Sequence, residues 1–229
     1  MYHIILLERD ALRVENAHLR ICPFLPPNNY FIFKAIDSKT PQIENSIQQF
    51  LLTTHKQYYL SNYIFNFTRG QLGCFLSHYT LWHNLLHQST LPYYIILEDD
   101  CVLDKSFQEH TQNVISELPP DYDFCYLYVY DDHYKNTTDV EIHNKQYINK
   151  AYFTWCALSY IISRQGAKKL LEYCKDIDLP LDEKIAHLIK NGTLNAYSAK
   201  TICVKNNGCK NLGDSTSSLP SNIWTSSIF

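Results

Sequence analysis

The sequence predicts a single α/β domain with a mainly parallel central sheet flanked by helices. The chain has 229 residues, which is enough to bury one sizeable hydrophobic core. Short apolar runs rich in aromatic and β-branched residues recur along it, and patterns with helical spacing separate them. Strands that alternate with helices in this way favour a sheet of mainly parallel order.

The apolar runs predict buried strands at residues 4–7, 30–35, 93–97, 124–130 and 158–163. The clearest helix is predicted at residues 71–87, because apolar side chains recur there at steps of three and four and share one face. A second helix is predicted at residues 164–175. From residue 191 the pattern weakens, so we expect one domain over residues 1–212 and a polar tail over residues 213–229.

Composition and charge exclude several classes of protein. A net charge of -3 gives no electrostatic footprint for binding nucleic acid. The first ten residues lack the basic lead of a signal peptide, and no window is apolar enough for a spanning helix. We therefore expect a cytoplasmic protein, with peripheral contact at the cytoplasmic face of the inner membrane left open. The eight cysteines form no CxxC pair, which favours free thiols over disulfides.

The third predicted strand ends in three acids, Glu98, Asp99 and Asp100. In open α/β sheets, ligands bind at the carboxyl ends of the strands. Three adjacent carboxylates repel one another unless a cation compensates them, and oxygen ligands favour Mg²⁺ or Mn²⁺ over zinc. Because side chains alternate along a strand, we expect Glu98 and Asp100 on one side, where they hold the metal, and Asp99 on the other. A solvated acidic turn is the simpler alternative.

Two motifs in fixed order resemble glycosyltransferase family 25, the lipooligosaccharide galactosyltransferases of Gram-negative bacteria and their collagen-modifying relatives. Residues 69–82 read RGQLGCFLSHYTLW and residues 96–103 read ILEDDCVL. They match a G-x-x-G-C-x-x-S-H-x-x-x-W helix followed by a strand ending in L-E-D-D-x-x-L. Weaker matches lie at residues 33–37, 118–123, 160–171 and 180–182.

The chain departs from the family pattern at a few positions. Leu6 replaces the Asn of an I-N-L strand, Ser38 stands where a Gly often follows the Asp, and Cys156-Ala157 replaces Gly-Thr. These changes affect the expected contacts to nucleotide and acceptor and leave the acidic motif intact. The resemblance implies a GT-A fold, with a Rossmann-like nucleotide-binding half and an acceptor half. It also implies an inverting, metal-dependent transfer of a hexose from UDP-galactose to a saccharide acceptor such as lipooligosaccharide core, as a β-galactosyltransferase would perform.

Donor contacts are expected at the same edge of the sheet. Glu98 and Asp99 would meet the UDP, although Asp99 could instead brace a neighbouring loop. Asp37 ends the second strand and could bind uridine, or it could be an ordinary turn aspartate. Arg9 could reach a phosphate, or it could form a surface ion pair. Gly70 stands at the start of the long helix, where the backbone can approach phosphate oxygens.

The remaining candidates concern positioning and the acceptor. Ser77 and His78 could touch the substrate or orient the acids, although a lone His on an apolar helix face is more often a core residue. An inverting transfer needs a base for the acceptor hydroxyl, and Asp182 is the first candidate, with Asp178 and Glu183 as rivals. The alternative for Asp182 is a helix cap.

Two other functions stay open. The acidic motif by itself would also suit a metal-dependent nucleotidyltransferase or phosphohydrolase, although the sequence has no GxxxxGK[ST] loop. A catalytically inactive, sugar-binding relative would keep the fold without turnover. The intact acidic triplet favours the enzyme.

Overall fold

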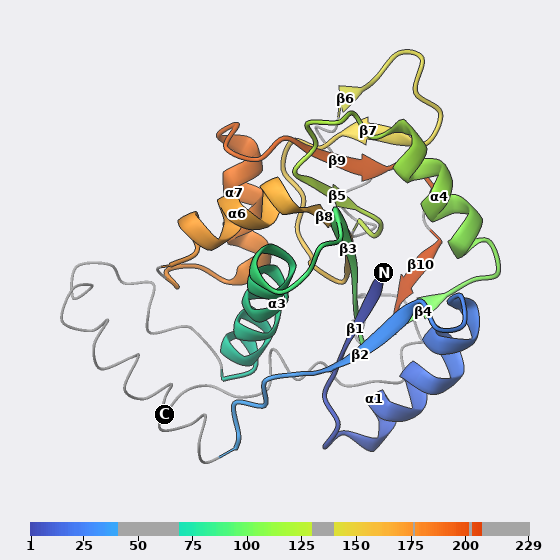
Figure 1. The fold of residues 1–229 in the computed structure, drawn as a ribbon, viewed down its shortest axis with the longest axis vertical. Coiled ribbons are helices and arrows are strands. Elements are labelled where there is room, and N and C mark those ends of the chain that lie inside the picture. Colours follow the sequence, from blue (N-terminus) through green and yellow to red (C-terminus); the bar gives the residue numbers. More distant parts are fainter. Residues whose placement is uncertain (41–68, 130–139, 176, 202, 208–229) are drawn as a thin grey trace, which may run out of the picture.

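The computed structural model describes residues 1–40, 69–129, 140–175, 177–201 and 203–207. A mixed eight-stranded sheet runs through the middle of the molecule, and helices lie on both of its faces (Figure 1). This arrangement confirms the predicted α/β class. The predicted polar tail over residues 213–229 lies outside the described residues.

The strands of the main sheet stand in the order β2-β1-β3-β8-β5-β9-β7-β6. In that order their bounds are Tyr30–Lys34, Tyr2–Leu6, Tyr93–Glu98, Ser159–Ser163, Phe124–Tyr126, Ala196–Ala199, Ile148–Lys150 and Val140–Glu141. A separate antiparallel pair joins β4 (Cys101–Leu103) to β10 (Val204–Asn206).

Strand direction corrects the expectation of a mainly parallel sheet. β1 is parallel to both β2 and β3, so the part that carries the acidic run is parallel as expected. However, β8 is antiparallel to β3 and β5, and β7 is antiparallel to β9. A strand buried on both faces is apolar whichever way it runs. The composition of residues 158–163 therefore predicted a buried strand and could not predict its direction.

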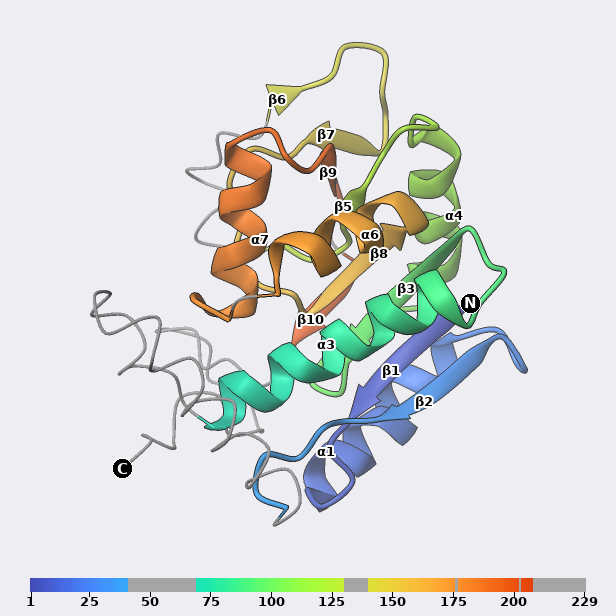
Figure 2. The same cartoon turned by 60° about the vertical axis from the view of Figure 1, so that its left-hand side comes forward.

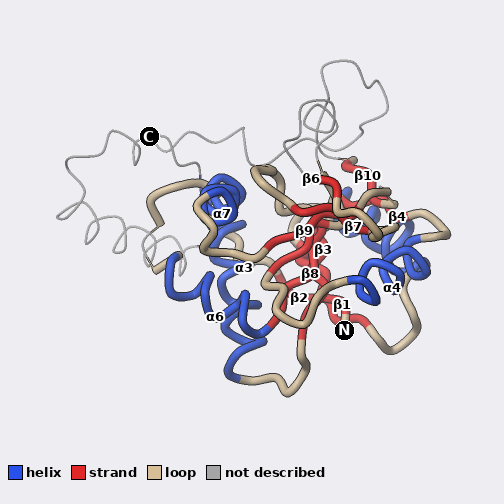
Figure 3. The backbone as a smooth tube through the Cα atoms, turned by 90° about the horizontal axis from the view of Figure 1, so that it is seen from above, coloured by secondary structure: helices blue, strands red, loops and turns tan. Residues whose placement is uncertain are grey.

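Helices α3 (Arg69–His87), α6 (Arg164–Tyr173) and α7 (Leu181–Lys190) lie on one face of the sheet (Figure 2). The other face carries α4 (Phe107–Glu117) and α1 (Ala11–Asn16), which continues as a π-helical turn (Ala17–Ile21) and a 3-10 turn (Cys22–Phe24). Figure 3 shows the strands between α3, α6 and α7 on one side and α4 on the other. Alternate residues of β3 therefore enter two different hydrophobic cores.

The predicted elements at residues 4–7, 30–35, 93–97 and 158–163 match β1, β2, β3 and β8 within two residues, and both predicted helices are present. The strand predicted at residues 124–130 is shorter, since β5 ends at Tyr126. The sequence did not predict α1, α4, β4, β7 or β9. α1 and the three strands have only three to six residues, too few to show a clear period, and the 11 residues of α4 are mostly polar.

The cysteines in the described part of the chain are free thiols, as predicted. No helix among the described residues has both the length and the apolar character that crossing a bilayer requires.

His3 of β1 is a buried, neutral histidine that should make the fold acid-sensitive. Its ring lies against the ring of Tyr94, with centroids 3.8 Å apart and the planes inclined by 32°, and neither ring nitrogen has a hydrogen-bond partner among the described residues. Burial lowers the pKa of His3 to about 4 from its ordinary 6.5. The folded state therefore binds fewer protons than the unfolded state between those pH values. The free energy of unfolding should fall as pH drops through that window, by at most about 3 kcal/mol from this group.

The substitution His3→Phe keeps a ring of similar shape and removes the titrating group. Urea denaturation at pH 7 and at pH 4.5 should show a smaller acid-induced loss of stability in His3→Phe than in the wild type. Equal losses in the two proteins would show that His3 does not titrate differently on unfolding.

Candidate functional site

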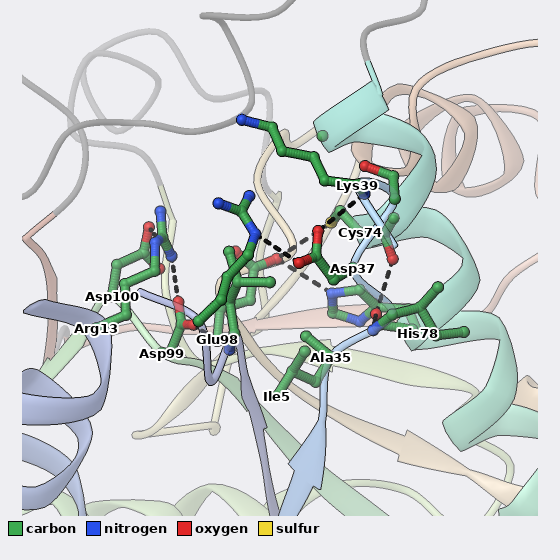
Figure 4. A pocket seen from close by; sticks show the side chains of 17 residues that line it. Ile5, Arg13, Ala35, Asp37, Lys39, Cys74, His78, Glu98, Asp99 and Asp100 are labelled. Atoms are coloured by element: carbon green, nitrogen blue, oxygen red, sulfur yellow. Dashed lines mark hydrogen bonds and ion pairs between the residues drawn. The ribbon is translucent and has the colours of Figure 1, made fainter. Parts of the chain in front are cut away.

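A cavity opens where β1, β2 and β3 end beside the first turns of α3 (Figure 4). These three strands are parallel, so their carboxyl ends meet at one edge of the sheet. The structure brings most of the predicted site residues together around this cavity, namely Arg9, Asp37, Gly70, Ser77, His78, Glu98, Asp99 and Asp100. Asp182 is not among the lining residues. The roles of these side chains stay predictions, which the contacts below refine.

The three acids do not alternate as the sequence predicted. β3 ends at Glu98, and Asp99 and Asp100 form a turn before β4, so the two-residue period of a strand no longer applies to them. Asp99 and Asp100 both face Arg13, whereas Glu98 faces His78 on α3 (Figure 4). The two-residue alternation expected of a strand therefore does not describe Asp99 and Asp100, while the charges of Glu98 and Asp100 both act on the Cys74 thiol, so their shared role as metal ligands stays a prediction.

Asp99 braces the loop after β1. One carboxylate oxygen accepts a hydrogen bond from the Leu7 amide at 2.8 Å, and the other is ion-paired with the Arg13 guanidinium. Asn16 fixes the backbone of the same turn by donating to the carbonyls of Asp99 and Cys101, each at 2.8 Å. Loop bracing was one of the two roles expected for Asp99, and these contacts support it.

Arg13 is a site residue that sequence reasoning missed. It lies on α1, is 7% exposed, and places Nη1 against Asp99 and 3.6 Å from Oδ2 of Asp100. An arginine near the start of a short helix resembles any surface arginine in the sequence. Only the fold, which packs α1 beside the end of β3, shows that its charge is used inside the protein.

Asp100 differs from the other two acids in the contacts of its carboxylate. Its Oδ1 is buried and has no hydrogen-bond partner among the described residues, while its Oδ2 lies 3.6 Å from Nη1 of Arg13. Burial and the negative charge of Glu98 raise the pKa of Asp100 to about 7. One buried guanidinium thus faces three carboxyl groups. A divalent cation beside Asp100 would supply the missing positive charge and a partner for the free oxygen.

Glu98 is held by a buried hydrogen-bond chain. The indole Nε1 of Trp82 can only donate, and it does so to the Tyr160 hydroxyl at 2.9 Å. That hydroxyl is therefore free to donate to Nδ1 of His78, 2.7 Å away. In this arrangement Nε2 of His78 carries the proton and donates to Oε1 of Glu98 at 3.1 Å. Burial raises the pKa of Glu98, but the bond from His78 and the charge of Arg13 outweigh it, and the net pKa lies below its ordinary value.

The same geometry bears on a second grouping of possible metal ligands. Single ligand atoms of Cys74, His78 and Glu98 lie within 4.8 Å of one another. Metal binding through Nε2 would move the proton of His78 to Nδ1 and leave the Tyr160 hydroxyl facing two donors. Burial and the nearby charge of Glu98 also raise the pKa of the Cys74 thiol well above its ordinary value, which disfavours the thiolate. These residues fit the hydrogen-bond chain better than a metal.

The substitution Tyr160→Phe should test this chain. It leaves the indole N–H of Trp82 and Nδ1 of His78 without a partner in a fully buried place. We expect the free energy of unfolding to fall by about 1–3 kcal/mol, measured by urea denaturation. Tyr173→Phe, at an exposed tyrosine, is the matched control and should be neutral. If Tyr160→Phe leaves the free energy of unfolding unchanged, the Tyr160 hydroxyl does not hold the hydrogen-bond chain together.

The end of β2 forms the opposite wall of the cavity. Arg9 pairs with Asp37 at 2.5 Å, and the Asp37 carboxylate also accepts from the Lys39 amide at 2.9 Å. Ser77 is fully buried and bridges the backbone, because its Oγ accepts from the Ile36 amide at 2.8 Å and donates to the Gly73 carbonyl at 2.7 Å. A side chain at Gly73 would come within 2.6 Å of the Ile36 carbonyl oxygen. Ser77 and Gly73 thus fasten α3 to this wall.

Asp182 lies in the first turn of α7, after an N-cap at Pro180, so it is not itself the capping residue. Its carboxylate accepts hydrogen bonds from the amides of Glu183, at 3.0 Å, and Cys156. Burial and the charge of Glu98 raise its pKa. The rival acids are engaged elsewhere: Asp178 with Lys184 at 2.6 Å, and Glu183 with His187 at 3.9 Å. Asp182 differs from these two acids in that its carboxylate forms no ion pair among the described residues, and its role as the base stays a prediction.

The chain is similar to proteins of one known family. Residues 3–185 match the family model described as glycosyltransferase family 25 (LPS biosynthesis protein). A "glycosyltransferase 25 family member" of Drosophila melanogaster is 30% identical over 118 residues, which is 51% of this chain and 19% of the relative. "Procollagen galactosyltransferase 1" of Danio rerio is 30% identical over 140 residues, 57% of this chain and 22% of the relative.

A "probable inactive glycosyltransferase 25 family member 3" of Bos taurus is 28% identical over 107 residues, 45% of this chain and 18% of the relative. The matched region therefore spans only about a fifth of the length of these relatives.

Proposed function

The chain belongs to glycosyltransferase family 25, and from that premise we propose that it transfers a hexose from a nucleotide sugar to a saccharide acceptor. The observation that carries the proposal is the buried, unpartnered carboxylate oxygen of Asp100 in an acidic cavity at the carboxyl edge of the sheet. An isolated buried carboxylate is unfavourable unless the functional state supplies a positive partner. A metal-bound diphosphate is such a partner.

We propose Asp100 and Glu98 as the residues that hold a divalent metal, Mn²⁺ or Mg²⁺. Their oxygen donors suit these hard cations, and Asp100 offers a free oxygen. When bound, the metal would stabilise the negative charge that develops on the departing nucleoside diphosphate. The protein contributes the orientation of both acids: the His78 chain fixes Glu98, and Arg13 fixes the turn of Asp99 and Asp100.

The donor is proposed to be UDP-galactose, lying along the wall formed by the end of β2. The named activity of the procollagen galactosyltransferase relative supports galactose. Arg9 and Lys39 bring positive charge to this wall for phosphate oxygens, and Asp37 offers a carboxylate for the uridine or ribose. Gly70, at the start of α3, lets the backbone approach the ligand.

The acceptor half of the reaction is proposed to use Asp182 as general base. The acceptor hydroxyl oxygen attacks the anomeric carbon of the sugar, the bond from that carbon to the diphosphate oxygen breaks, and Asp182 takes the hydroxyl proton. Attack from the face opposite the leaving group inverts the anomeric centre, which gives a β-linked product from an α-linked donor. A lipooligosaccharide core is the acceptor class that we propose.

The test is a donor screen with the purified chain, Mn²⁺ and a panel of UDP-sugars and saccharide acceptors. Acceptor-dependent release of UDP is the expected result. Release of UMP or inorganic phosphate would instead favour the nucleotidyltransferase or phosphohydrolase alternative. Thermal stabilisation by UDP and Mn²⁺ with no UDP release would identify a non-catalytic relative, a possibility that the bovine protein named as probably inactive keeps relevant.

A further inference from the structure

An aromatic loop lies between β7 and β8, over residues 151–158. Two of its aromatic side chains are exposed to solvent, Tyr152 by 43% and Trp155 by 41%. The ring of Phe153 contacts Trp155 edge-on, with centroids 5.8 Å apart, and it contacts His187 of α7 at 5.6 Å. Nζ of Lys190 lies 5.4 Å from the centre of the Phe153 ring. Trp155 is therefore a partly exposed aromatic side chain beside Phe153, and Phe153 in turn contacts α7.

Polar side chains of α7 lie beside this aromatic loop. Glu183, His187 and Lys190 are spaced by four and three residues, so they share one side of the helix over roughly 10 Å. The side chains of Glu183 and His187 are 39% and 50% exposed and lie 3.9 Å apart. Hydrogen-bonding groups thus flank the aromatic surface, an arrangement suited to a ligand with one apolar face and several hydroxyls.

The aromatic loop is tied directly to the proposed base. Cys156, the residue after Trp155, donates its backbone amide to the carboxylate of Asp182. Cys156 has a φ of +83°, in the left-handed region that non-glycine residues avoid at a cost of about 1–2 kcal/mol. Such strain persists where the surrounding structure imposes it, commonly at functional sites. The turn places Trp155 next in sequence to the residue that contacts Asp182.

We propose that Trp155 and Phe153, with Glu183, His187 and Lys190, form the acceptor subsite and bind a saccharide. The apolar face of a sugar ring would pack on Trp155, and its hydroxyls would bond to Glu183 and His187. This inference rests on the proposed function, because it places the acceptor hydroxyl beside Asp182. A protein partner fits less well, since the exposed apolar surface is a narrow aromatic strip bordered by charged groups.

The test compares the wild type with Trp155→Ala, using methyl glycosides of galactose, glucose and N-acetylglucosamine as acceptor probes. We expect the acceptor KM to rise about tenfold, because one aromatic stacking contact is lost. The kcat and the KM for the donor should stay unchanged. Trp155→Tyr should restore most of the affinity. Tyr173→Ala, at an exposed aromatic residue on α6, is the control and should match the wild type.

A direct titration separates the two proposals. Tryptophan fluorescence of the wild type should shift as a methyl glycoside is added, and the shift should vanish in Trp155→Ala. An unchanged acceptor KM in Trp155→Ala, in an enzyme that releases UDP, would overturn the subsite and leave the proposed function standing. A wild type that releases no UDP would overturn the proposed function. In that case the titration still tests Trp155: a fluorescence shift that Trp155→Ala abolishes would show that Trp155 binds sugar, and the absence of a shift would overturn the subsite.

Discussion

Replacing Asp100 with asparagine is expected to reduce UDP release by about a thousandfold and, at the same time, to stabilise the metal-free protein. The first effect follows from the loss of a charged metal ligand, because several kcal/mol of transition-state stabilisation would disappear with it. Asparagine has nearly the shape of aspartate, so the fold around the turn should be kept. Opposite signs for activity and stability are the signature of an acid kept for function.

The gain in stability follows from the direction of the pKa shift. The pKa of Asp100 is about 7 in the folded state and 3.8 in its ordinary surroundings, so the folded state binds more protons between those values. The free energy of unfolding of the metal-free wild type should therefore fall as pH rises through that window. Asparagine carries no charge at any pH and avoids the loss, which is about 4 kcal/mol at pH 7 and above.

Thermal melts with EDTA and with Mn²⁺ plus UDP, combined with the UDP-release assay, measure both effects. The wild type should melt higher with Mn²⁺ and UDP, and Asp100→Asn should gain little from them. Glu109→Gln, at an exposed acid on α4, is the control and should leave activity and melting temperature unchanged. An Asp100→Asn protein that melts below the wild type in EDTA would show that the carboxylate is satisfied without a cation. Full Mn²⁺-dependent activity in that variant would remove Asp100 as a ligand.

Local sequence patterns predicted the part of the site that lies on regular elements. The apolar run of β3 followed by three acids predicted the edge of the sheet correctly, and the helical spacing of residues 71–87 placed His78 and Trp82 on one helix. Such features depend on the properties of neighbouring residues. Strands and helices predicted from such local features are therefore present in the folded protein unless tertiary packing overrides the local preference.

The missing parts depend on contacts between residues that are far apart in the chain. Arg13 meets Asp99 across 86 positions, and Tyr160 meets His78 across 82. No local periodicity records such a pairing. The strict alternation expected for Asp99 and Asp100 failed for a related reason, because β3 ends at Glu98 beside the antiparallel strand β8, and a turn into β4 follows. Local patterns therefore predicted most of the side chains that gather here but missed Arg13, and they could not predict which partner each side chain takes.

Replacing Arg13 with methionine should be among the most destabilising single changes in the protein. Methionine fills a similar volume, so the effect reports the lost charge. Without the guanidinium, Asp99 loses its buried ion pair, and Asp100 loses the positive group that lies 3.6 Å from its carboxylate. Removing one partner of a buried ion pair costs about 3–5 kcal/mol, because the other charge is left uncompensated. Urea denaturation in EDTA measures this loss, and Arg20→Met, at an exposed arginine, is the control.

A double-mutant cycle with Asp99→Asn shows whether the loss comes from the ion pair or from packing. If the uncompensated carboxylate is the cause, Arg13→Met with Asp99→Asn should be more stable than Arg13→Met alone, with a coupling energy of roughly 1–3 kcal/mol. Losses that simply add would mean that Arg13 acts through its aliphatic stem. Because Asp99 also holds the Leu7 amide, which an asparagine oxygen can still accept, the loop after β1 should stay in place in the double variant. The cycle therefore isolates the charge that Arg13 supplies to the acidic turn.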